Sequence, residues 1–381
     1  MGHHRKKMLS IFINEDCNLA CMYCYVGTHK KHEIGDIESI IPQLVSKQSS
    51  SPRVISLEFA KRAILDFFDK YESRTIRFFS TGEATLGFNR MKEIRDWVTD
   101  ITHGNGKFEL QTNGYFSPSI AQWIAENIDT VWISCDGPPE IQNRYRPTMF
   151  GQPSSNVVAR NIEFLTHQPK ITVGCRVTIG AANLNRQKEF IDYFNSLGVK
   201  AIMSDPIFLP IDGGRESLSK EKINLMDYAA KFLEARQYAI NKGIFYGSIF
   251  SVNFDEPVDI FCRSCAPYPH LTVDNHITCC DMVCNDSDPK MQVLVYGKYL
   301  PQENRIEYYP EKIRAIQSRT VANLTNCQGC KVLHNCAGAC LGEAVNETGS
   351  MMGIKPDVCE AIRFLVDHME LNKGLYPFLH S

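Results

Sequence analysis

The sequence of 381 residues has no apolar run approaching the roughly 18–20 residues of a membrane span, and no signal peptide precedes its first predicted strand. It also has no excess of either charge, since 41 Lys and Arg residues stand against 43 Asp and Glu residues and the formal net charge is −2. A nearly neutral chain gives no reason to expect a nucleic acid or an anionic membrane as a partner. No internal repeat is evident. We therefore expect a cytoplasmic globular protein with neither kind of partner.

Cysteine, in contrast, is abundant, with 15 residues. Nothing indicates export, and in a reducing cytosol clustered cysteines indicate metal ligands rather than disulfides. Three of them open the chain in the segment C-N-L-A-C-M-Y-C, as Cys17, Cys21 and Cys24. A closed structural zinc site takes four protein ligands, whereas a 4Fe-4S cluster held by three thiolates keeps one iron open for another molecule. The triad therefore predicts a cluster whose open iron has a function.

Strand-like and helix-like segments alternate over the first half of the chain. Short β-branched or aromatic runs predict strands at 8–13, 75–79, 108–112, 131–135, 172–179 and 200–203. Amphipathic segments predict helices at 57–70, 119–127, 156–166 and 186–197, and a longer one at 219–241. The alternation predicts parallel strands with right-handed crossovers, in an open six-unit relative of the (β/α) barrel. In such a fold the active site lies at the carboxyl ends of the strands.

Polar segments follow three of the predicted strands. They are S-T-G-E-A-T at 80–85, Q-T-N-G at 111–114 and S-C-D-G-P-P-E-I-Q-N-R-Y-R at 134–146. Taken alone, Glu83 is a solvated loop carboxylate, and the other segments are turns in which Gly114 and Gly137 supply a permissive backbone. The position of Glu83 at the end of the second strand favours a functional role.

The second half has the most specific spacing in the chain, Cys327-x2-Cys330-x5-Cys336-x3-Cys340-x18-Cys359. Cys262-x2-Cys265 and Cys265-x14-Cys280 precede it. The Cys-x2-Cys pairs fit zinc as well as iron, but the N-terminal triad favours iron–sulfur clusters. Beside these, Cys135 and Cys175 are expected to be small buried hydrophobic residues in apolar strands. Either Cys279 or Cys284 could replace Cys280 as a ligand, because C-C-D-M-V-C offers three thiolates within six residues.

The N-terminal triad, with Tyr23 before its last member, resembles the cluster loop of the radical S-adenosylmethionine (SAM) superfamily. The strand-end motifs resemble those of its peptide- and protein-modifying members, and the later cysteines resemble the SPASM extension. The resemblance implies an α/β fold, with a partial (β/α)6 radical SAM barrel followed by a cysteine-rich SPASM extension that binds two auxiliary clusters. We expect the barrel over 8–215, a bridging helical segment over 216–254 and the extension over 255–370, stabilised in part by bound metal.

The resemblance also implies roles for residues around SAM. The triad would bind the SAM-cleaving cluster. A G-G-E-P loop of the family holds the amino group of SAM, and this chain keeps Gly82 and Glu83 but has Thr81 and Ala84 instead of Gly and Pro. The other residues implied to lie at SAM are Tyr23, Asn113, Ser134 and Arg160. The alternative for Arg160 is an exposed position on a helix.

For the auxiliary clusters the resemblance implies two ligand sets. Cys327, Cys330, Cys336 and Cys359 would bind the distal cluster, and Cys262, Cys265, Cys280 and Cys340 the one nearer the active site. Asn275 stands where the family has glycine, and asparagine tolerates a positive φ. Asp281 matches an aspartate proposed as catalytic base in anaerobic sulfatase-maturating enzymes, and its alternative role is a hydrogen-bond partner of the cluster loop.

The implied activity is the reductive cleavage of SAM to a 5′-deoxyadenosyl radical that abstracts a hydrogen atom from the substrate. The implied cofactors are three 4Fe-4S clusters and SAM. The expected partners are a peptide or protein substrate and a reductant such as flavodoxin or ferredoxin. Because the first strand starts by residue 8, we expect no N-terminal leader-binding domain, so a separate leader-peptide-binding protein or direct recognition would replace it.

We expect the product to be an oxidative modification or crosslink (thioether, carbon–carbon or ether) in a ribosomally made peptide. The alternative is an anaerobic sulfatase maturase that forms formylglycine from Cys or Ser. A more remote alternative is a non-catalytic iron–sulfur electron carrier, which would need neither the Glu83 loop nor a cluster with three protein ligands.

Overall fold

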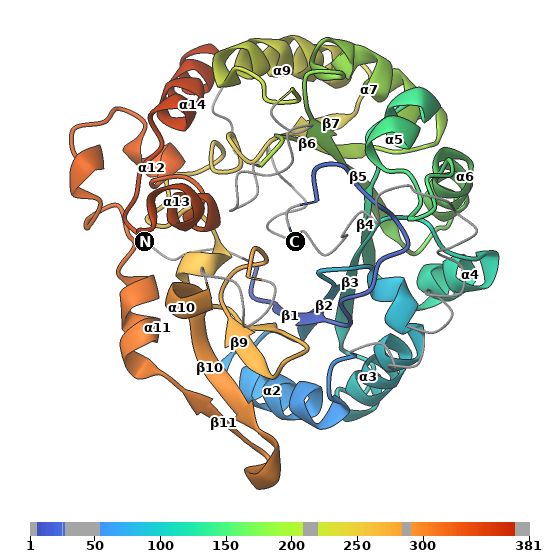
Figure 1. The fold of residues 1–381 in the computed structure, drawn as a ribbon, viewed down its shortest axis with the longest axis vertical. Helices are drawn as coiled ribbons and strands as arrows, with labels where there is room; N and C mark the ends of the chain where they lie inside the picture. Colours follow the sequence, from blue (N-terminus) through green and yellow to red (C-terminus); the bar gives the residue numbers. More distant parts are fainter. Residues whose placement is uncertain (1–5, 25, 27–53, 209–219, 284–290, 370–381) are drawn as a thin grey trace, which may run out of the picture.

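The computed structural model describes residues 6–24, 26, 54–208, 220–283 and 291–369. Its strands form one sheet of 11 strands in the order β11-β10-β9-β8-β1-β2-β3-β4-β5-β6-β7. The strands of the first half are all parallel to their neighbours, and they curve into a partial barrel with helices around the outside (Figure 1). They are β1 (Leu9–Phe12), β2 (Thr75–Phe79), β3 (Lys107–Thr112), β4 (Thr130–Ser134), β5 (Thr172–Ile179), β6 (Ala201–Pro206) and β7 (Phe245–Gly247).

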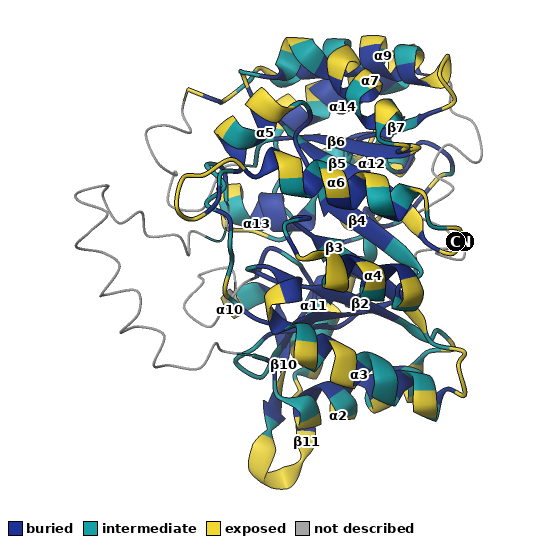
Figure 2. Cartoon of the chain, turned by 90° about the vertical axis from the view of Figure 1, so that its right-hand side faces the viewer, coloured by how far each residue is buried: buried dark blue, intermediate teal, exposed yellow. Residues whose placement is uncertain are grey.

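The helices of the first half cover the outer face of this sheet and bury one side each (Figure 2). They are α2 (Leu57–Lys70), α3 (Phe88–Ile101), α4 (Pro118–Asn127), α5 (Pro139–Tyr145), α6 (Ser155–Thr166), α7 (Gln187–Ser196) and α9 (Leu225–Ile240). Local sequence explains their starts: Ser56 caps α2 by accepting a hydrogen bond from Phe59 N, and Ser117 caps α4 before a proline at its first position.

The predicted strand–helix alternation is confirmed, because all six predicted strands and four helices between them are present. The prediction missed α3, α5 and the seventh strand, and it named no strand or helix after residue 241, where four further strands and five helices also lie among the described residues. It also started the long helix too early, since α9 begins at Leu225 after the capping residue Asn224. Part of the expected boundary around residue 215 lies outside the described residues.

The second half extends the barrel sheet. Strand β8 (His270–Leu271) pairs in parallel with β1, and β9 (His276–Thr278), β10 (Val295–Leu300) and β11 (Arg305–Tyr308) follow as an antiparallel series. The helices are α10 (Met291–Leu294), α11 (Pro310–Gln317), α12 (Leu333–Cys336), α13 (Leu341–Thr348) and α14 (Pro356–His368), and α14 packs on α9.

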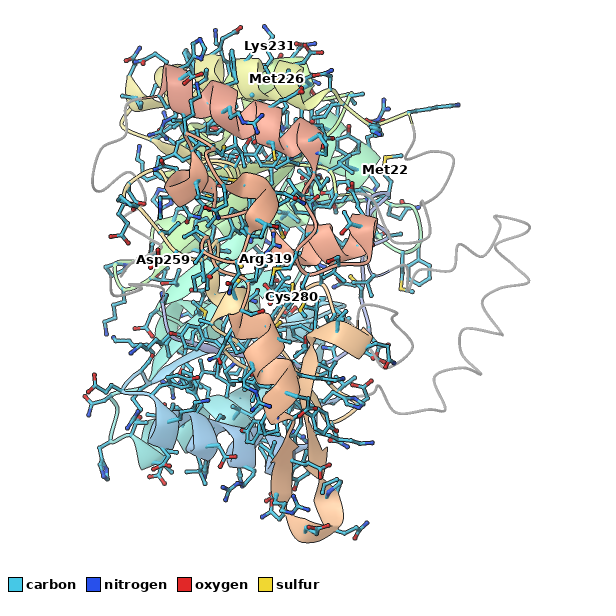
Figure 3. The ribbon with its side chains drawn as sticks, turned by 90° about the vertical axis from the view of Figure 1, so that its left-hand side faces the viewer. Met22, Met226, Lys231, Asp259, Cys280 and Arg319 are labelled. Carbon is cyan, nitrogen blue, oxygen red and sulfur yellow. The ribbon has the colours of Figure 1, made fainter. Side chains whose placement is uncertain are left out.

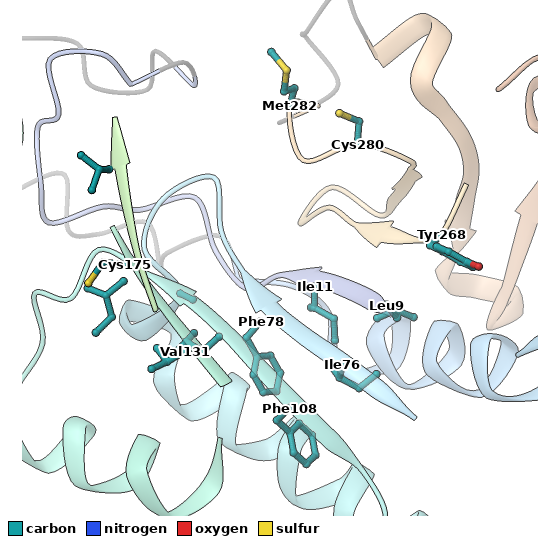
Figure 4. Packing of buried hydrophobic residues seen from close by; sticks show 14 of the residues in the cluster. Leu9, Ile11, Ile76, Phe78, Phe108, Val131, Cys175, Tyr268, Cys280 and Met282 are labelled. Atoms are coloured by element: carbon teal, nitrogen blue, oxygen red, sulfur yellow. The ribbon is translucent and has the colours of Figure 1, made fainter. Parts of the chain in front are cut away.

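One hydrophobic core joins the two halves. It includes Leu9 and Phe78 of the barrel strands and Tyr268 and Leu365 of the second half (Figure 4). The cysteine-rich half therefore shares a core with the barrel, in addition to any stability that bound metal supplies. None of the helices in the described part of the chain combines the length and apolar character that a membrane span requires.

Candidate active site

The three N-terminal cysteines lie on a loop that directly follows β1. This cluster loop (residues 17–24) runs along residues 145–149, to which it is joined by backbone hydrogen bonds from Ala20 N to Pro147 O (2.8 Å) and from Met22 N to Tyr145 O (2.9 Å). The backbone of the loop is thus fixed by a segment of the chain that is more than 100 residues away in sequence.

The thiols of Cys17, Cys21 and Cys24 are free and partly exposed. Burial raises the pKa of Cys17 to about 12, and the neighbouring charges of Cys21 and Cys24 act in the same direction. Burial also raises the pKa of Cys21 to about 11, against the positive charge of Arg146. The three sulfurs therefore lie close enough to affect each other's ionisation, and a bound metal would stabilise their thiolate forms.

The loop after β2 packs directly onto the residue before the triad. Glu83 N donates a hydrogen bond to Asp16 O over 2.7 Å. A Cβ atom at Gly82 would lie 1.9 Å from the same Asp16 oxygen, so no larger residue fits there while the two backbones keep this approach. This contact explains why the chain keeps Gly82 although Thr81 and Ala84 depart from the family motif.

The Glu83 carboxylate is almost fully buried, at 2% exposure, and its oxygens accept four hydrogen bonds. Oε1 accepts from Thr85 N (3.0 Å), Thr85 Oγ1 (2.8 Å) and Thr112 Oγ1 (2.7 Å), and Oε2 accepts from Asn113 N (2.6 Å). A carboxylate oxygen offers about two lone pairs, so Oε2 keeps capacity for one more donor. The carboxylate is therefore fixed in place and still able to bind an ammonium group.

Asn113 connects this loop to the cluster loop. Its side-chain nitrogen donates to Asn18 Oδ1 over 2.8 Å and lies 3.8 Å from Cys17 Sγ. The structure thus brings together Glu83, Asn113 and the triad, as the sequence predicted for neighbouring strand ends. Ser134 ends β4 on the same barrel.

In the described part of the chain, Arg160 is not hydrogen-bonded to the group formed by Glu83, Asn113 and the triad. It is exposed on α6 and lines a pocket of about 380 Å³ together with Asn18, Thr85 and Tyr115. Its Nη2 is 3.4 Å from Asn161 Oδ1. No hydrogen bond among the described residues joins the Arg160 guanidinium to Glu83 or to the cysteine triad.

A buried ionic network that sequence reasoning missed supports the cluster loop. Asp136 accepts hydrogen bonds from Tyr23 Oη and from Arg146 Nε (3.1 Å), and Asp136 is fully buried. The Arg146 guanidinium also lies over the Tyr23 ring, 5.2 Å from its centroid, and its Nη1 is 3.6 Å from Cys21 Sγ. The sequence does contain evidence for this pair, because Asp136 and Arg146 have opposite charges and stand near the two ends of the 134–146 motif.

The cysteines of the second half fall into two sets of neighbours. In the distal set, burial and then Cys330 raise the pKa of Cys327, and burial and then Cys359 raise that of Cys336 to about 12. The pKa of Cys359 is likewise raised by burial, with Cys327 and Cys330 adding to it. These four are the residues that the sequence predicted to share the distal cluster.

The proximal set of four cysteines has Cys279 as a further neighbouring thiol. Cys265 shares a hydrogen bond with Cys262 that, together with burial, raises the pKa of the Cys265 thiol. Burial raises the pKa of Cys280 to about 12, and Cys262 adds to it. The pKa of Cys340 rises through burial, with contributions from Cys280 and Cys262, and the pKa of Cys279 rises through burial and the same two neighbours.

Gly342 packs against the segment that contains Cys280 and Met282. A Cβ atom at Gly342 would lie 3.0 Å from Cys280 Sγ, so the absence of a side chain at Gly342 makes room for that sulfur. Asn275 has a φ of 69°, which confirms that it adopts the conformation expected at the family's glycine position. Cys284 lies outside the described residues.

Asp281, which follows Cys280, faces three basic side chains. It pairs with Arg77 of β2, its Oδ1 is 3.0 Å from His270 Nε2, and Arg263 Nη2 lies at 3.7 Å. Burial alone would raise the pKa of Asp281, but the charge of Arg77 and the interactions with His270 outweigh burial and hold that pKa well below its usual value. Its side chain is still 34% exposed.

The donor chemistry fits iron–sulfur clusters. All 14 described cysteines are free, and no described group of three or more His, Cys, Asp or Glu side chains converges tightly enough to hold a single metal ion. Cluster ligands bind separate irons and therefore stand further apart than the ligands of one ion. Three sets of interacting thiols, each from a loop with backbone support, match that requirement.

Comparison with known proteins places this site in a family. Residues 11–200 match the profile of the Radical SAM superfamily. Uncharacterized protein MJ0907 of Methanocaldococcus jannaschii is 27% identical over 201 residues, which cover 52% of this chain and 62% of that protein. The radical SAM cyclopropyl synthase TigE of Paramaledivibacter caminithermalis is 20% identical over 389 residues, covering 98% of this chain and 76% of TigE. The cysteine-type anaerobic sulfatase-maturating enzyme of Clostridium novyi is 24% identical over 314 residues, covering 80% of this chain and 78% of that enzyme.

Solved structures share the fold along nearly the whole chain. Native anSMEcpe with bound AdoMet superimposes with a TM-score of 0.72 at 17% identity, over 95% of this chain and 96% of that one. Streptococcus suis SuiB bound to its precursor peptide SuiA gives a TM-score of 0.61 at 13% identity, over 93% of this chain and 76% of SuiB. The barrel and its cysteine-rich extension therefore form the arrangement that the sequence motifs predicted.

Proposed function

The chain belongs to the radical SAM superfamily, with a SPASM-type extension, and from that premise we propose that it catalyses an oxidative modification or crosslink in a ribosomally made peptide. Family membership implies an oxidoreductase-type enzyme with a 4Fe-4S cluster and SAM. The observation that carries the proposal is that the loop of Glu83 is hydrogen-bonded to the residue before the cysteine triad. A cluster with an open iron and a carboxylate beside it would together bind SAM.

The residues of this chain would divide the work of holding these groups. Cys17, Cys21 and Cys24 would bind three irons of the first cluster. The free lone pair on Glu83 Oε2 would accept a hydrogen bond from the amino group of SAM, and Ser134, at the end of β4, would lie near its ribose or carboxylate. When bound, the cluster and SAM together supply the one-electron chemistry that removes a hydrogen atom from the substrate.

The buried network below the cluster loop would keep these ligands in register. Asp136 and Arg146 join the backbone turn after β4 to Tyr23 and to the Cys21 sulfur. A charged pair that is hydrogen-bonded on several sides is rigid in a low-dielectric interior. We assign to this pair the positioning of the cluster loop.

The extension would hold two further clusters, which gives three in all. The distal set is Cys327, Cys330, Cys336 and Cys359, and the proximal set is Cys262, Cys265, Cys280 and Cys340. Their role would be to accept the second electron of an oxidative reaction, and a flavodoxin or ferredoxin would supply the first. The ion pair of Asp281 with Arg77 already engages the Asp281 carboxylate, which favours its alternative role as a hydrogen-bond partner near the cluster loop over that of a base.

A sulfatase maturase is the second candidate, because the match to anSMEcpe extends over both chains almost entirely. The alignment with TigE favours a peptide substrate instead, since it spans 98% of this chain. The two candidates differ in the substrate that they would accept. A separate leader-peptide-binding protein is expected only for the peptide modification.

The test begins with the protein reconstituted anaerobically with iron and sulfide, reduced with dithionite and given SAM. Release of 5′-deoxyadenosine, measured by mass spectrometry, supports the enzyme proposal, and its absence contradicts it. Replacing Cys17, Cys21 and Cys24 by alanine should abolish release while about eight of twelve irons remain bound. Cys175→Ala is the matched control, because this buried strand cysteine is outside all three sets and should leave both values unchanged.

Substrate class is tested with two peptides in the same assay. One is a short Cys- or aromatic-bearing peptide chosen from the neighbouring genes, and the other is a sulfatase segment with its target Cys or Ser. A mass loss in the first peptide supports peptide modification. Formylglycine in the second would instead establish the sulfatase maturase.

A further inference from the structure

Arg319 is the largest fully buried side chain in the described part of the chain, with 0% exposure. It follows α11 and lies in the cysteine-rich half (Figure 3). Its guanidinium donates to three backbone carbonyls: Met351 O, Gly338 O (2.5 Å) and Ala339 O (3.4 Å). No described carboxylate forms an ion pair with it, and its Nε, also buried, has no hydrogen-bond partner among the described residues. A buried cation of this kind needs an anion that the protein groups around it do not supply.

The carbonyls that Arg319 binds belong to an unusual loop. Ala337, Gly338 and Ala339 have φ values of 45°, 78° and 57°, so three successive residues are left-handed although two of them are alanines. Such a conformation is costly for alanine and persists only where surrounding contacts hold it. Ala339 N donates a hydrogen bond to Cys336 O over 2.9 Å, so the loop folds back onto the distal cysteine. Successive backbone amides in a turn conformation form an anion-binding concavity, a feature that is common at iron–sulfur sites.

The loop also stands at the junction of the two auxiliary cysteine sets. It connects Cys336 of the distal set to Cys340 of the proximal set. Arg319 Nη2 donates to Gly338 O and Ala339 O of this loop, so one buried guanidinium holds the short segment that joins a cysteine of each set.

We propose that Arg319 is the common counter-charge of the two auxiliary clusters, and that by holding the 337–339 loop it raises the reduction potentials of both. This inference rests on the proposed assignment of the two sets as cluster ligands. Bound clusters with thiolate ligands are anionic and would supply the charge that Arg319 lacks in its surroundings. Positive charge and amide hydrogen bonds at the sulfurs favour the reduced, more negative state of a cluster. Arg319 is thus a positioning residue that makes both clusters better electron acceptors.

The experiment uses the full chain with all clusters reconstituted, and it measures the midpoint potential of each cluster by redox titration followed by electron paramagnetic resonance. Arg319→Met removes the charge and the bonds to the loop, and Arg319→Lys retains the charge. For Arg319→Met we expect the reduced-to-oxidised ratio of both auxiliary clusters at a fixed potential to fall at least tenfold, which is about 59 mV for a one-electron couple. The SAM cluster in the same sample is the internal reference and should not move.

Arg314→Met is the matched control, because Arg314 lies on α11, five residues before Arg319, and is exposed, so that water screens its charge. We expect the reduced-to-oxidised ratio of each auxiliary cluster in this variant to stay within about twofold of wild type. Arg319→Lys should keep both auxiliary ratios close to wild type. Unchanged potentials in Arg319→Met would overturn the proposal, as would equal shifts of all three clusters.

Loss of the auxiliary clusters is also informative. If Arg319→Met and Arg319→Gln lose them while Arg319→Lys keeps them, the requirement is for a positive charge, as proposed. If Arg319→Lys loses them as well, the role is packing and the proposal is wrong. Failure of the proposed function would appear separately, as a wild-type protein that binds about four irons only or releases no 5′-deoxyadenosine.

Discussion

The buried carboxylate of Glu83 offers a test that does not depend on any bound cofactor. Its two oxygens accept four hydrogen bonds, two of them from the backbone amides of Thr85 and Asn113. Glu83→Gln keeps the size of the side chain but turns one acceptor into a donor. If the glutamine oxygen accepts the hydrogen bonds of Thr85 and Thr112, the new NH2 group faces Asn113 N. Both groups are donors, so the Asn113 amide has no acceptor.

The cost follows from that one orphaned amide. A buried donor left without a partner costs about 1–3 kcal/mol. The opposite orientation of the glutamine would orphan the three donors at Oε1 and cost more, so the first orientation sets the expected value. We therefore expect Glu83→Gln to lower the free energy of unfolding by about 1–3 kcal/mol, with or without SAM.

Urea unfolding under anaerobic, reducing conditions measures this loss as a shift in the midpoint at constant m-value. Glu93→Gln is the matched control, because Glu93 pairs with Arg90 on the exposed side of α3 and should change stability by less than about 0.5 kcal/mol. Equal stability of Glu83→Gln and wild type would refute the described network. It would then follow that the carboxylate is not engaged by the protein and is held only when SAM is present.

Three further predictions concern close approaches and one acidic group. Gly82→Ala should abolish SAM cleavage and lower the unfolding midpoint, since its Cβ would lie 1.9 Å from Asp16 O, and wild-type values in both assays would contradict the described approach. Gly342→Ala should lower the iron content by about four per chain, because its Cβ would crowd Cys280 Sγ at 3.0 Å, and full iron content would favour another ligand. Hydrogen bonds and an ion pair outweigh the effect of burial and lower the pKa of Glu221 in the folded protein. The Glu221 carboxylate therefore contributes its full stabilisation above the unfolded pKa near 4.5, and this stabilisation is lost as the pH falls through the folded pKa. Glu221→Gln should therefore lose less stability than wild type between neutral pH and pH below about 4, as followed by thermal unfolding, and parallel pH curves would contradict this.

The parts of the fold that the sequence predicted are those set by local pattern. The barrel strands β1 to β6, each of four or more residues, were predicted, and α2 begins at the serine cap that the sequence contains. Strands β10 and β11, with six and four residues, were not predicted. Strands β7 and β8 have three and two residues, too few to show a period of two, and they depend on pairing with β6 and β1. Their absence from the prediction has this physical cause.

The residues of the candidate site also fall into those that the sequence predicted and those that it did not. The family resemblance implied two ligand sets, and within each set the thiols affect one another's pKa, as neighbours do. Spacing cannot separate Cys279 from Cys280, which are adjacent and buried to 0% and 6% exposure, and only the space left by Gly342 distinguishes them. The role of Arg319 depends on partners 19 and 32 residues away, and no local pattern of the sequence contains that information.

The two halves of the molecule are also joined by a polar contact at the centre of the sheet. Ser10 Oγ of β1 accepts hydrogen bonds from Arg77 Nε (3.0 Å) and from Arg263 Nη2 (2.7 Å), and Arg77 pairs with Asp281. Arg263 lies between two cysteines of the proximal set, and Asp281 follows a third. One hydroxyl group on the strand that leads into the cluster loop thus binds, directly or through Arg77, both segments that supply the proximal set. Because Ser10 and Arg77 are buried, a shift of either segment would break hydrogen bonds in a low-dielectric interior. We therefore expect strand β1 to hold the N-terminal triad and the proximal thiols at a constant spacing, as electron exchange between two clusters would require.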